Sequence, residues 1–266
     1  MTNKQWDTYR LSAGVDDSAW EIFHENSKTT HFAPFPSDEE TLSMMQYFWE
    51  ALPFENYPKI ELPAPSENLP CSLSEAIVNR VSTRDMKPIP LSLKDLSSIL
   101  FYSYGITRDN LETGFPRPFR TIPSAGAMYP LELFLYASHV EGLDPGIYHY
   151  NPNNYLRLIK EGDLAVEISN CLVQSYLAHQ ASAIFFITAM FERSTFKYGD
   201  RGYRFVFLES GHLAQNMNLI STALGLASLN IGGYFDSQVD ALLNLDGLTH
   251  STTYAVCVGG KIQGED

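Results

Sequence analysis

Apolar residues recur at helical spacing between Tyr203 and Leu224, which predicts a long helix over that range. The apolar arc is wider than a surface helix needs, so we expect this helix to lie in the core. Before it, a polar loop is expected to carry the pair Lys197-Tyr198, and after it a turn is expected at Gly232-Gly233. The pattern therefore predicts reactive side chains on one side of a buried helix and an open backbone on the other.

The patterns in the rest of the chain predict a mixture of helices and strands. Two helices are expected here: one opens with Ser72-Leu-Ser-Glu75, which fits a capping box, and one is an amphipathic helix over residues 92–105, closed by a glycine. Period-two and continuous apolar runs predict strands at 131–137, 146–150, 155–159, 183–190 and 253–259, with a further helix over 163–178. Because the second and third strands form a hairpin around an Asn-Pro turn, the fold class is α+β.

The first 70 residues differ from the remainder in composition. Short helices are predicted near residues 19–25 and 37–52, followed by a connector rich in proline, which favours extended backbone. The sequence is therefore divided into a helical arm with its connector over residues 1–70 and a main domain over residues 71–266.

Composition and charge narrow the classes of function. The chain carries a net charge of −13, and its 18 Lys and Arg residues are dispersed, which argues against nucleic-acid binding. Any phosphate must then be bound by a local pocket. Cys71, Cys171 and Cys257 lack metal or disulfide spacing, and no signal peptide or membrane span is visible. A cytoplasmic location is expected.

Several common catalytic motifs do not occur in the sequence. There is no G-x-G-x-x-G or Walker sequence for nucleotides, no H-E-x-x-H for zinc and no G-x-S-x-G nucleophile elbow. His24-Glu25 has no second ligand at usable spacing, so we expect no metal site.

Arg80, Ser82 and Arg84 follow the helix that begins after Ser72. Two guanidinium groups and a hydroxyl at alternate positions suit a phosphate, although the spacing alone favours ordinary surface residues. Lys197-Tyr198, taken alone, likewise fits a surface loop.

Six segments in register resemble one family. They are Arg80-Val-Ser-Thr-Arg84, Pro123-Ser-Ala-Gly-Ala-Met-Tyr-Pro130, Gly146-Ile-Tyr-His-Tyr150, Lys197-Tyr198, Glu209-Ser-Gly-His212 and Ile231-Gly-Gly233. Their order and spacing resemble the SagB/ThcOx-type dehydrogenases, flavin-dependent azoline oxidases of the nitroreductase superfamily. The resemblance covers residues 66–261, and residues 19–28 resemble the family's leading segment.

The resemblance implies a nitroreductase-like fold, with a mostly antiparallel central sheet surrounded by helices and a small helical arm. It also implies FMN bound noncovalently in a site shared by two subunits of a homodimer. Arg80, Ser82 and Arg84 would hold the phosphate, the ribityl chain and the pyrimidine edge, although Val81 stands where many relatives carry a polar residue. The further positions that the resemblance assigns are Pro123, Ser124, Ala125, Gly126 and Tyr129 from the other subunit, Gly232 and Gly233 near flavin N5, and Lys261 near the phosphate.

Lys197 and Tyr198 are the catalytic residues that the resemblance implies. Converting an azoline to an azole removes a Cα proton, which needs a base, and a Cβ hydride, which passes to the flavin. A buried lysine or a tyrosine ionised with that lysine's help would be the base. We expect His149 and His212 to be structural, and Arg201 and Arg204 to hold the reactive loop.

The sequence therefore predicts an FMN-dependent dehydrogenase of thiazoline or oxazoline rings in a ribosomal peptide or a carrier-bound intermediate. A cyclodehydratase or an assembly line would be its partner. Two alternatives remain open, namely an NAD(P)H-dependent nitro or quinone reductase and a non-catalytic scaffold of a biosynthetic complex.

Overall fold

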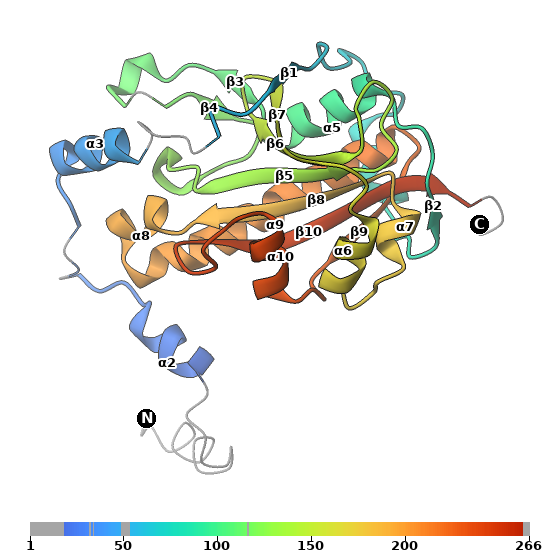
Figure 1. The fold of residues 1–266 in the computed structure, drawn as a ribbon. Coiled ribbons are helices and arrows are strands. Elements are labelled where there is room, and N and C mark those ends of the chain that lie inside the picture. The colour runs from blue at the N-terminus through green and yellow to red at the C-terminus, as the bar shows by residue number, and fades with distance from the viewer. Residues whose placement is uncertain (1–18, 32, 34, 49–53, 116, 263–266) are drawn as a thin grey trace.

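The computed structural model of the protein describes residues 19–31, 33, 35–48, 54–115 and 117–262, and Figure 1 shows a central sheet with helices on both sides. The sheet has the order β1-β7-β6-β5-β8-β10-β2, and β9 pairs with β10. Every pairing between named strands is antiparallel. The main strands are β5 (Leu131–Ala137), β6 (Gly146–Asn151), β7 (Tyr155–Glu161), β8 (Ala183–Met190), β9 (Ala227–Ile231) and β10 (His250–Lys261).

Alternate residues of β5 enter two separate hydrophobic cores. Leu131, Leu133 and Leu135 face α5 (Leu93–Tyr104) and α9 (Asp200–Ala223). Phe134 and Tyr136 face the other core, which contains α6 (Ala165–Cys171), α7 (Leu177–Gln180) and α10 (Asp236–Leu242). All seven residues of β5 are consequently buried, on both faces of the sheet. The α+β class and the mostly antiparallel sheet are confirmed.

The helix predicted over 163–178 is wrong as a single element. Residues 172–176 separate α6 from α7, because their backbone pairs with the glycine turn. Val173 N donates to the carbonyl of Gly233 at 2.9 Å, and Leu172 forms a bridge with Tyr234. The periodic spacing of apolar residues indicates which face of an element is buried. It does not indicate which partners the backbone hydrogen bonds have.

The loop predicted for Lys197-Tyr198 is also wrong, because both residues end a helix, α8 (Glu192–Tyr198). Gly199, with φ 55° and ψ −145°, separates α8 from α9, which begins three residues before the predicted start. This backbone conformation is easily reached only by glycine. α8 therefore ends with the Lys197-Tyr198 pair, and α9 begins directly after Gly199.

The long helix α9 is only partly a core helix. Val206, Leu213 and Met217 are fully buried, but Leu208 is 60% exposed and Phe207 is 42% exposed. In a single chain, part of the predicted apolar arc therefore faces outward.

Some short elements have no clear signal in the sequence. These are β1 (Lys59–Glu61), β2 (Met86–Lys87), the hairpin β3 (Ile106–Arg108) and β4 (Phe119–Arg120), two short 3-10 turns, and α10. Strands of two or three residues are too short for a period to be read. β1 lies in the proline-rich connector and joins the sheet edge beside β7.

The helices predicted near residues 19–25 and 37–52 are present as α2 (Ala19–Asn26) and α3 (Asp38–Tyr47), the second with a capping box at Ser37. The end of the second prediction, residues 49–52, lies outside the described residues. α4 (Leu73–Asn79) has the predicted capping box at Ser72. α2 lies outside the layers of the sheet, near the start of α9 (Figure 1). None of the helices described here combines the length and the apolar character needed to cross a membrane.

A buried carboxylate connects the sheet to α8. Glu132 in β5 accepts a hydrogen bond from Arg193 Nη1 at 2.5 Å and pairs with His149 Nε2 at 2.7 Å, and all three side chains are buried. Burial disfavours the ionised carboxyl, but the charge of Arg193 and the bond from His149 hold the pKa of Glu132 well below its usual value. The start of β5 and the helix carrying Lys197 are thus joined by charge-assisted bonds.

We predict that Arg193→Met lowers the free energy of unfolding by about 3–5 kcal/mol, because the Glu132 carboxylate then stays buried without its guanidinium. The exposed pair Lys59–Glu61 supplies the control, and Lys59→Met should cost less than about 1 kcal/mol. Denaturant titrations of the two variants measure both values. Equal losses in the two variants would contradict this role of the buried pair.

Candidate functional site

Residues 124–129 form a strained segment between β4 and β5. Gly126, Ala127 and Tyr129 have φ values of 60°, 53° and 44°, so three residues of this short segment are left-handed. For alanine and tyrosine this conformation costs on the order of 1–3 kcal/mol each, and it persists only where the surroundings hold it. The segment is therefore held in place by other parts of the structure.

Several hydrogen bonds hold the two ends of this segment. Ser124 Oγ accepts from the backbone N–H of Tyr129 at 2.8 Å and donates to Glu209 Oε2 at 2.5 Å. The backbone N–H of Arg120 donates to Tyr129 Oη at 2.9 Å, and the guanidinium of Arg117 donates to the carbonyl of Met128. The segment is thus held by the side chain of Glu209 in α9, by the backbone of Arg120 in β4, and by the side chain of Arg117 just before β4.

The strained segment lies against the Lys197-Tyr198 pair. A Cβ atom at Gly126 would lie 2.4 Å from Tyr198 Oη and 3.5 Å from Lys197 Nζ, so only glycine fits there without displacing the pair. Lys197 Nζ also lies 5.9 Å from the ring centre of Phe115. Lys197 and Tyr198 are both half-buried. We call residues 123–129 together with this pair the loop cluster.

Four other predicted residues gather at a different place. Arg80 ends α4 and donates to Ser82 Oγ at 3.4 Å, and Ser82 bridges to Ser228 in β9. Lys261, the last residue of β10, pairs with Met86 in β2, just after Arg84. We call Arg80, Ser82, Arg84 and Lys261 the cationic cluster. In the described part of the chain, neither of its arginines pairs with a carboxylate.

The two clusters lie at opposite ends of α9. Lys197 and Tyr198 directly precede its first turn, while β9, which bridges to Ser82, starts just after its last turn. A helix of 24 residues is about 36 Å long. The structure therefore brings the predicted residues together in two groups, and one chain does not join those groups into one site.

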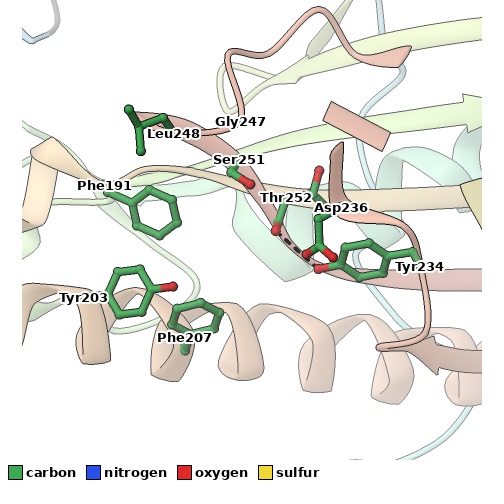
Figure 2. A pocket seen from close by; sticks show the side chains of 9 residues that line it. All are labelled: Phe191, Tyr203, Phe207, Tyr234, Asp236, Gly247, Leu248, Ser251 and Thr252. Carbon is green, nitrogen blue, oxygen red and sulfur yellow. Dashed lines mark hydrogen bonds between the residues drawn. The ribbon is translucent and has the colours of Figure 1, made fainter. Parts of the chain in front are cut away.

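Gly232 and Gly233 follow β9 and turn the chain toward α10. Gly232 is exposed, with open space where a Cβ would stand, whereas Gly233 lies against Val173. Next to this turn is a cavity of about 410 Å³. Figure 2 shows the rings of Phe191, Tyr203 and Phe207 on one side of it and Tyr234 with Thr252 on the other. Tyr234 Oη donates to the carbonyl of Thr252 at 3.2 Å, which fixes the ring.

Residues 77–260 match the model of the Nitroreductase family, which covers more than half of the chain. The chain belongs to the Nitroreductase family. MJ1384 of Methanocaldococcus jannaschii, whose name assigns it provisionally to the nitroreductases, is 35% identical over 189 residues, which cover 70% of this chain and 90% of that protein.

Two further relatives of this nitroreductase-family chain are named as processing proteins. The microcin B17-processing protein McbC of Escherichia coli is 33% identical over 143 residues, 48% of this chain and 49% of McbC. The trifolitoxin-processing protein TfxB of Rhizobium leguminosarum bv. trifolii is 27% identical over 180 residues, 64% of this chain and 48% of TfxB. The matched region thus spans about half the length of either protein.

Solved structures support the same fold. A nitroreductase-type protein from Anabaena variabilis superimposes with a TM-score of 0.70 at 23% identity, over 91% of this chain and 47% of that one. A chain of the E. coli microcin synthetase McbBCD complex, solved with truncated pro-MccB17 bound, gives 0.58 at 22% identity over 92% of both chains.

Several expectations about individual side chains need correction. Arg201 and Arg204 donate to the carbonyls of Ser27 and His24, so both also hold the N-terminal arm, which the sequence did not predict. His149 is structural as expected, but His212 is exposed on α9. Burial raises the pKa of Tyr198 and so favours its neutral phenol, opposite to the assisted ionisation expected from the sequence.

Glu209 is a residue of this site to which sequence reasoning gave no role. Its carboxyl is buried beneath Ser124, and Tyr104 Oη lies 3.5 Å from its other oxygen. Burial raises the pKa of Glu209 to about 7, and the bond from Ser124 and the charge of Arg120 offset part of that effect. The sequence signal was a single acidic residue among the apolar positions of the α9 pattern.

We predict that Glu209 makes the stability of this protein fall as the pH rises from about 4.5 to about 7. In that range the folded carboxyl binds more protons than the unfolded one, so raising the pH favours unfolding, by up to roughly 3 kcal/mol in total. Glu209→Gln should remove this part of the pH dependence, as measured by denaturant titrations at several pH values. Glu167→Gln, which changes an exposed carboxyl on α6, is the control. Parallel pH profiles for wild type and Glu209→Gln would contradict the prediction.

Proposed function

We propose that this nitroreductase-family protein is an FMN-dependent dehydrogenase that oxidises thiazoline or oxazoline rings to thiazoles or oxazoles. Its substrate would be a ribosomally made peptide or a carrier-bound intermediate. The observation that carries the proposal is the close packing of Lys197 and Tyr198 against Gly126 of the strained segment. This arrangement places the amine of Lys197 and the phenol of Tyr198 next to a backbone position that carries no side chain.

The cationic cluster fits the phosphate end of FMN. Arg80 and Arg84 offer guanidinium groups that no described carboxylate neutralises, in a chain whose net charge is −13. Guanidinium groups and a hydroxyl are suitable phosphate ligands. Gly232 leaves open space above its backbone, which suits the close approach of a flat ring.

The positions of the two clusters support a site shared between two copies of the chain. Lys197 lies about one length of α9 away from the cationic cluster of its own chain. In a symmetric dimer, the loop cluster of one copy would complete the site held by the cationic cluster of the other. The exposed apolar side chains of α9 support such an interface.

The bound flavin would supply the acceptor for the hydride that leaves Cβ of the azoline, and oxygen would reoxidise it. The protein must remove the proton from Cα. Because burial favours the neutral phenol of Tyr198, we assign this step to the side-chain nitrogen of Lys197, with the Tyr198 hydroxyl orienting the ring. The proton ends on Lys197 Nζ, and the ring loses two hydrogens in total.

The relatives McbC and TfxB, which process microcin B17 and trifolitoxin, support a peptide substrate. An azoline is formed from a cysteine, serine or threonine by loss of water, so we propose a cyclodehydratase or an assembly-line enzyme as the partner. The nitroreductase name of MJ1384 favours, as a second candidate, an NAD(P)H-dependent reductase of nitro compounds or quinones.

We predict that Lys197→Ala lowers kcat for azoline oxidation by about 100-fold or more while the protein stays yellow, because a general base is lost and the flavin ligands remain. Mass spectrometry of a heterocyclised peptide, scored for loss of two hydrogens per ring, measures the reaction. Lys94→Ala, a lysine in α5 far from the pair in sequence, is the control.

Rapid flavin reduction by NAD(P)H that is unaffected by Lys197→Ala, with no change in any azoline, would instead support the reductase. A colourless protein that takes up no FMN would point to a scaffold.

A mixing experiment tests the shared site. Arg84→Ala should lose FMN and Lys197→Ala should lose the base, so each variant alone is inactive. After the two are denatured and refolded together, about half of the dimers should be mixed, each with one intact site, which restores about a quarter of wild-type activity. Arg84→Ala refolded with the double variant Arg84→Ala/Lys197→Ala should restore none. Absence of recovery in the first mixture, with mixed dimers demonstrated, would contradict the shared site.

A further inference from the structure

We propose that Glu209 is a positioning residue for the Lys197-Tyr198 pair, acting through Ser124 and the strained segment that packs against the pair. This inference rests on the proposed function, because it assigns Glu209 a part in placing the catalytic amine. Glu209 itself is neither one of the candidate flavin ligands nor the proposed base.

The connection runs through three consecutive contacts. Glu209 Oε2 accepts from Ser124 Oγ at 2.5 Å, and Ser124 Oγ accepts from the backbone N–H of Tyr129 at 2.8 Å. Ser124 thereby closes the segment into a loop whose far side is Gly126. The position of a Cβ at Gly126 is only 2.4 Å from Tyr198 Oη, so movement of the segment is transmitted directly to the pair.

The strained backbone explains why such an anchor is needed. Ala127 and Tyr129 hold left-handed conformations that these residues avoid unless they are constrained. Glu209 belongs to the long helix α9 and is almost fully buried, so its carboxyl is fixed relative to the core that α9 shares with α5 and β5. A buried carboxylate on a rigid helix is a better reference point than a surface group, because few alternative positions are open to it.

The groups around Glu209 suit this role. Tyr104 Oη donates to the carbonyl of Leu131 at 2.9 Å and lies 3.5 Å from Glu209 Oε1. The Arg120 guanidinium lies over the rings of Tyr104 and Tyr129, and Arg117 and Arg120 both act electrostatically on Glu209. The carboxyl thus lies among groups from α5, from β4 and the residues before it, and from the strained segment, and it connects all three to α9.

Glu209→Met tests the proposal, since methionine keeps the length of the side chain and removes the acceptor for Ser124. We expect the backbone amides of residues 124–129 and 197–199 to exchange hydrogen about tenfold faster, as loss of one buried hydrogen bond implies. Glu209→Gln, which keeps one acceptor oxygen, should restore part of the protection. Ser124→Ala removes the same hydrogen bond together with the one from the Tyr129 N–H, so exchange in it should be at least as fast as in Glu209→Met. The double variant should exchange no faster than Ser124→Ala.

Ser210→Ala is the matched control, because Ser210 is the next buried polar residue of α9 and bonds to Val206 and Thr253 instead of the strained segment. It should leave the exchange of residues 124–129 unchanged. With an azoline peptide, Glu209→Met should lower kcat per bound flavin about tenfold with KM near wild type, because the amine is misplaced and the substrate contacts remain.

The possible results separate this inference from the proposed function. Unchanged exchange at residues 124–129 and 197–199 in both Glu209→Met and Ser124→Ala would overturn the positioning role. Faster exchange that Glu209→Gln partly reverses, in a protein whose wild type oxidises no azoline, would support the role of Glu209 in holding the pair and remove the proposed function.

Discussion

The arrangement of this protein depends on the ion pair that the buried carboxylate of Glu132 forms. Glu132 lies at the start of β5, directly after the strained segment, and it binds Arg193 of α8 and His149 of β6. Arg193 precedes Lys197 by one helical turn. The ion pair therefore fixes α8, which carries Lys197 and Tyr198, to β5, which follows the strained segment. This contact helps to hold the two side chains against Gly126.

A second buried carboxyl, Glu209, acts on the same segment from the opposite side. Glu132 fixes the segment through the strand that follows it, and Glu209 fixes it through Ser124 at its beginning. Such polar groups are costly to bury, and the structure satisfies each with charged or hydroxyl partners. Backbone strain and buried polar groups thus occur together at one place, which is the pattern expected where a function requires side chains to be held accurately.

The long helix α9 determines how the candidate site is divided. Its 24 residues separate the loop cluster from the cationic cluster, and its outward face keeps apolar side chains exposed in a single chain. A second copy of the chain would explain both the separation of the clusters and the exposed apolar side chains. It would cover the outward face of α9 and bring its own loop cluster to the cationic cluster of the first copy. The membership of the chain in the Nitroreductase family is established independently of this dimer, which stays a proposal.

The sequence by itself determined the elements whose patterns are long enough to read, since β5 and β8 have the predicted bounds and the capping box at Ser72 starts a helix. It also indicated the family, because motif order and spacing are properties of the chain. Only the tertiary structure decided that Lys197 and Tyr198 end a helix, that Gly126 touches them, and that residues 172–176 interrupt a predicted helix. These facts depend on contacts between segments that are far apart in the sequence. The spacing of apolar residues shows which side chains are buried, but it does not show which segment they pack against.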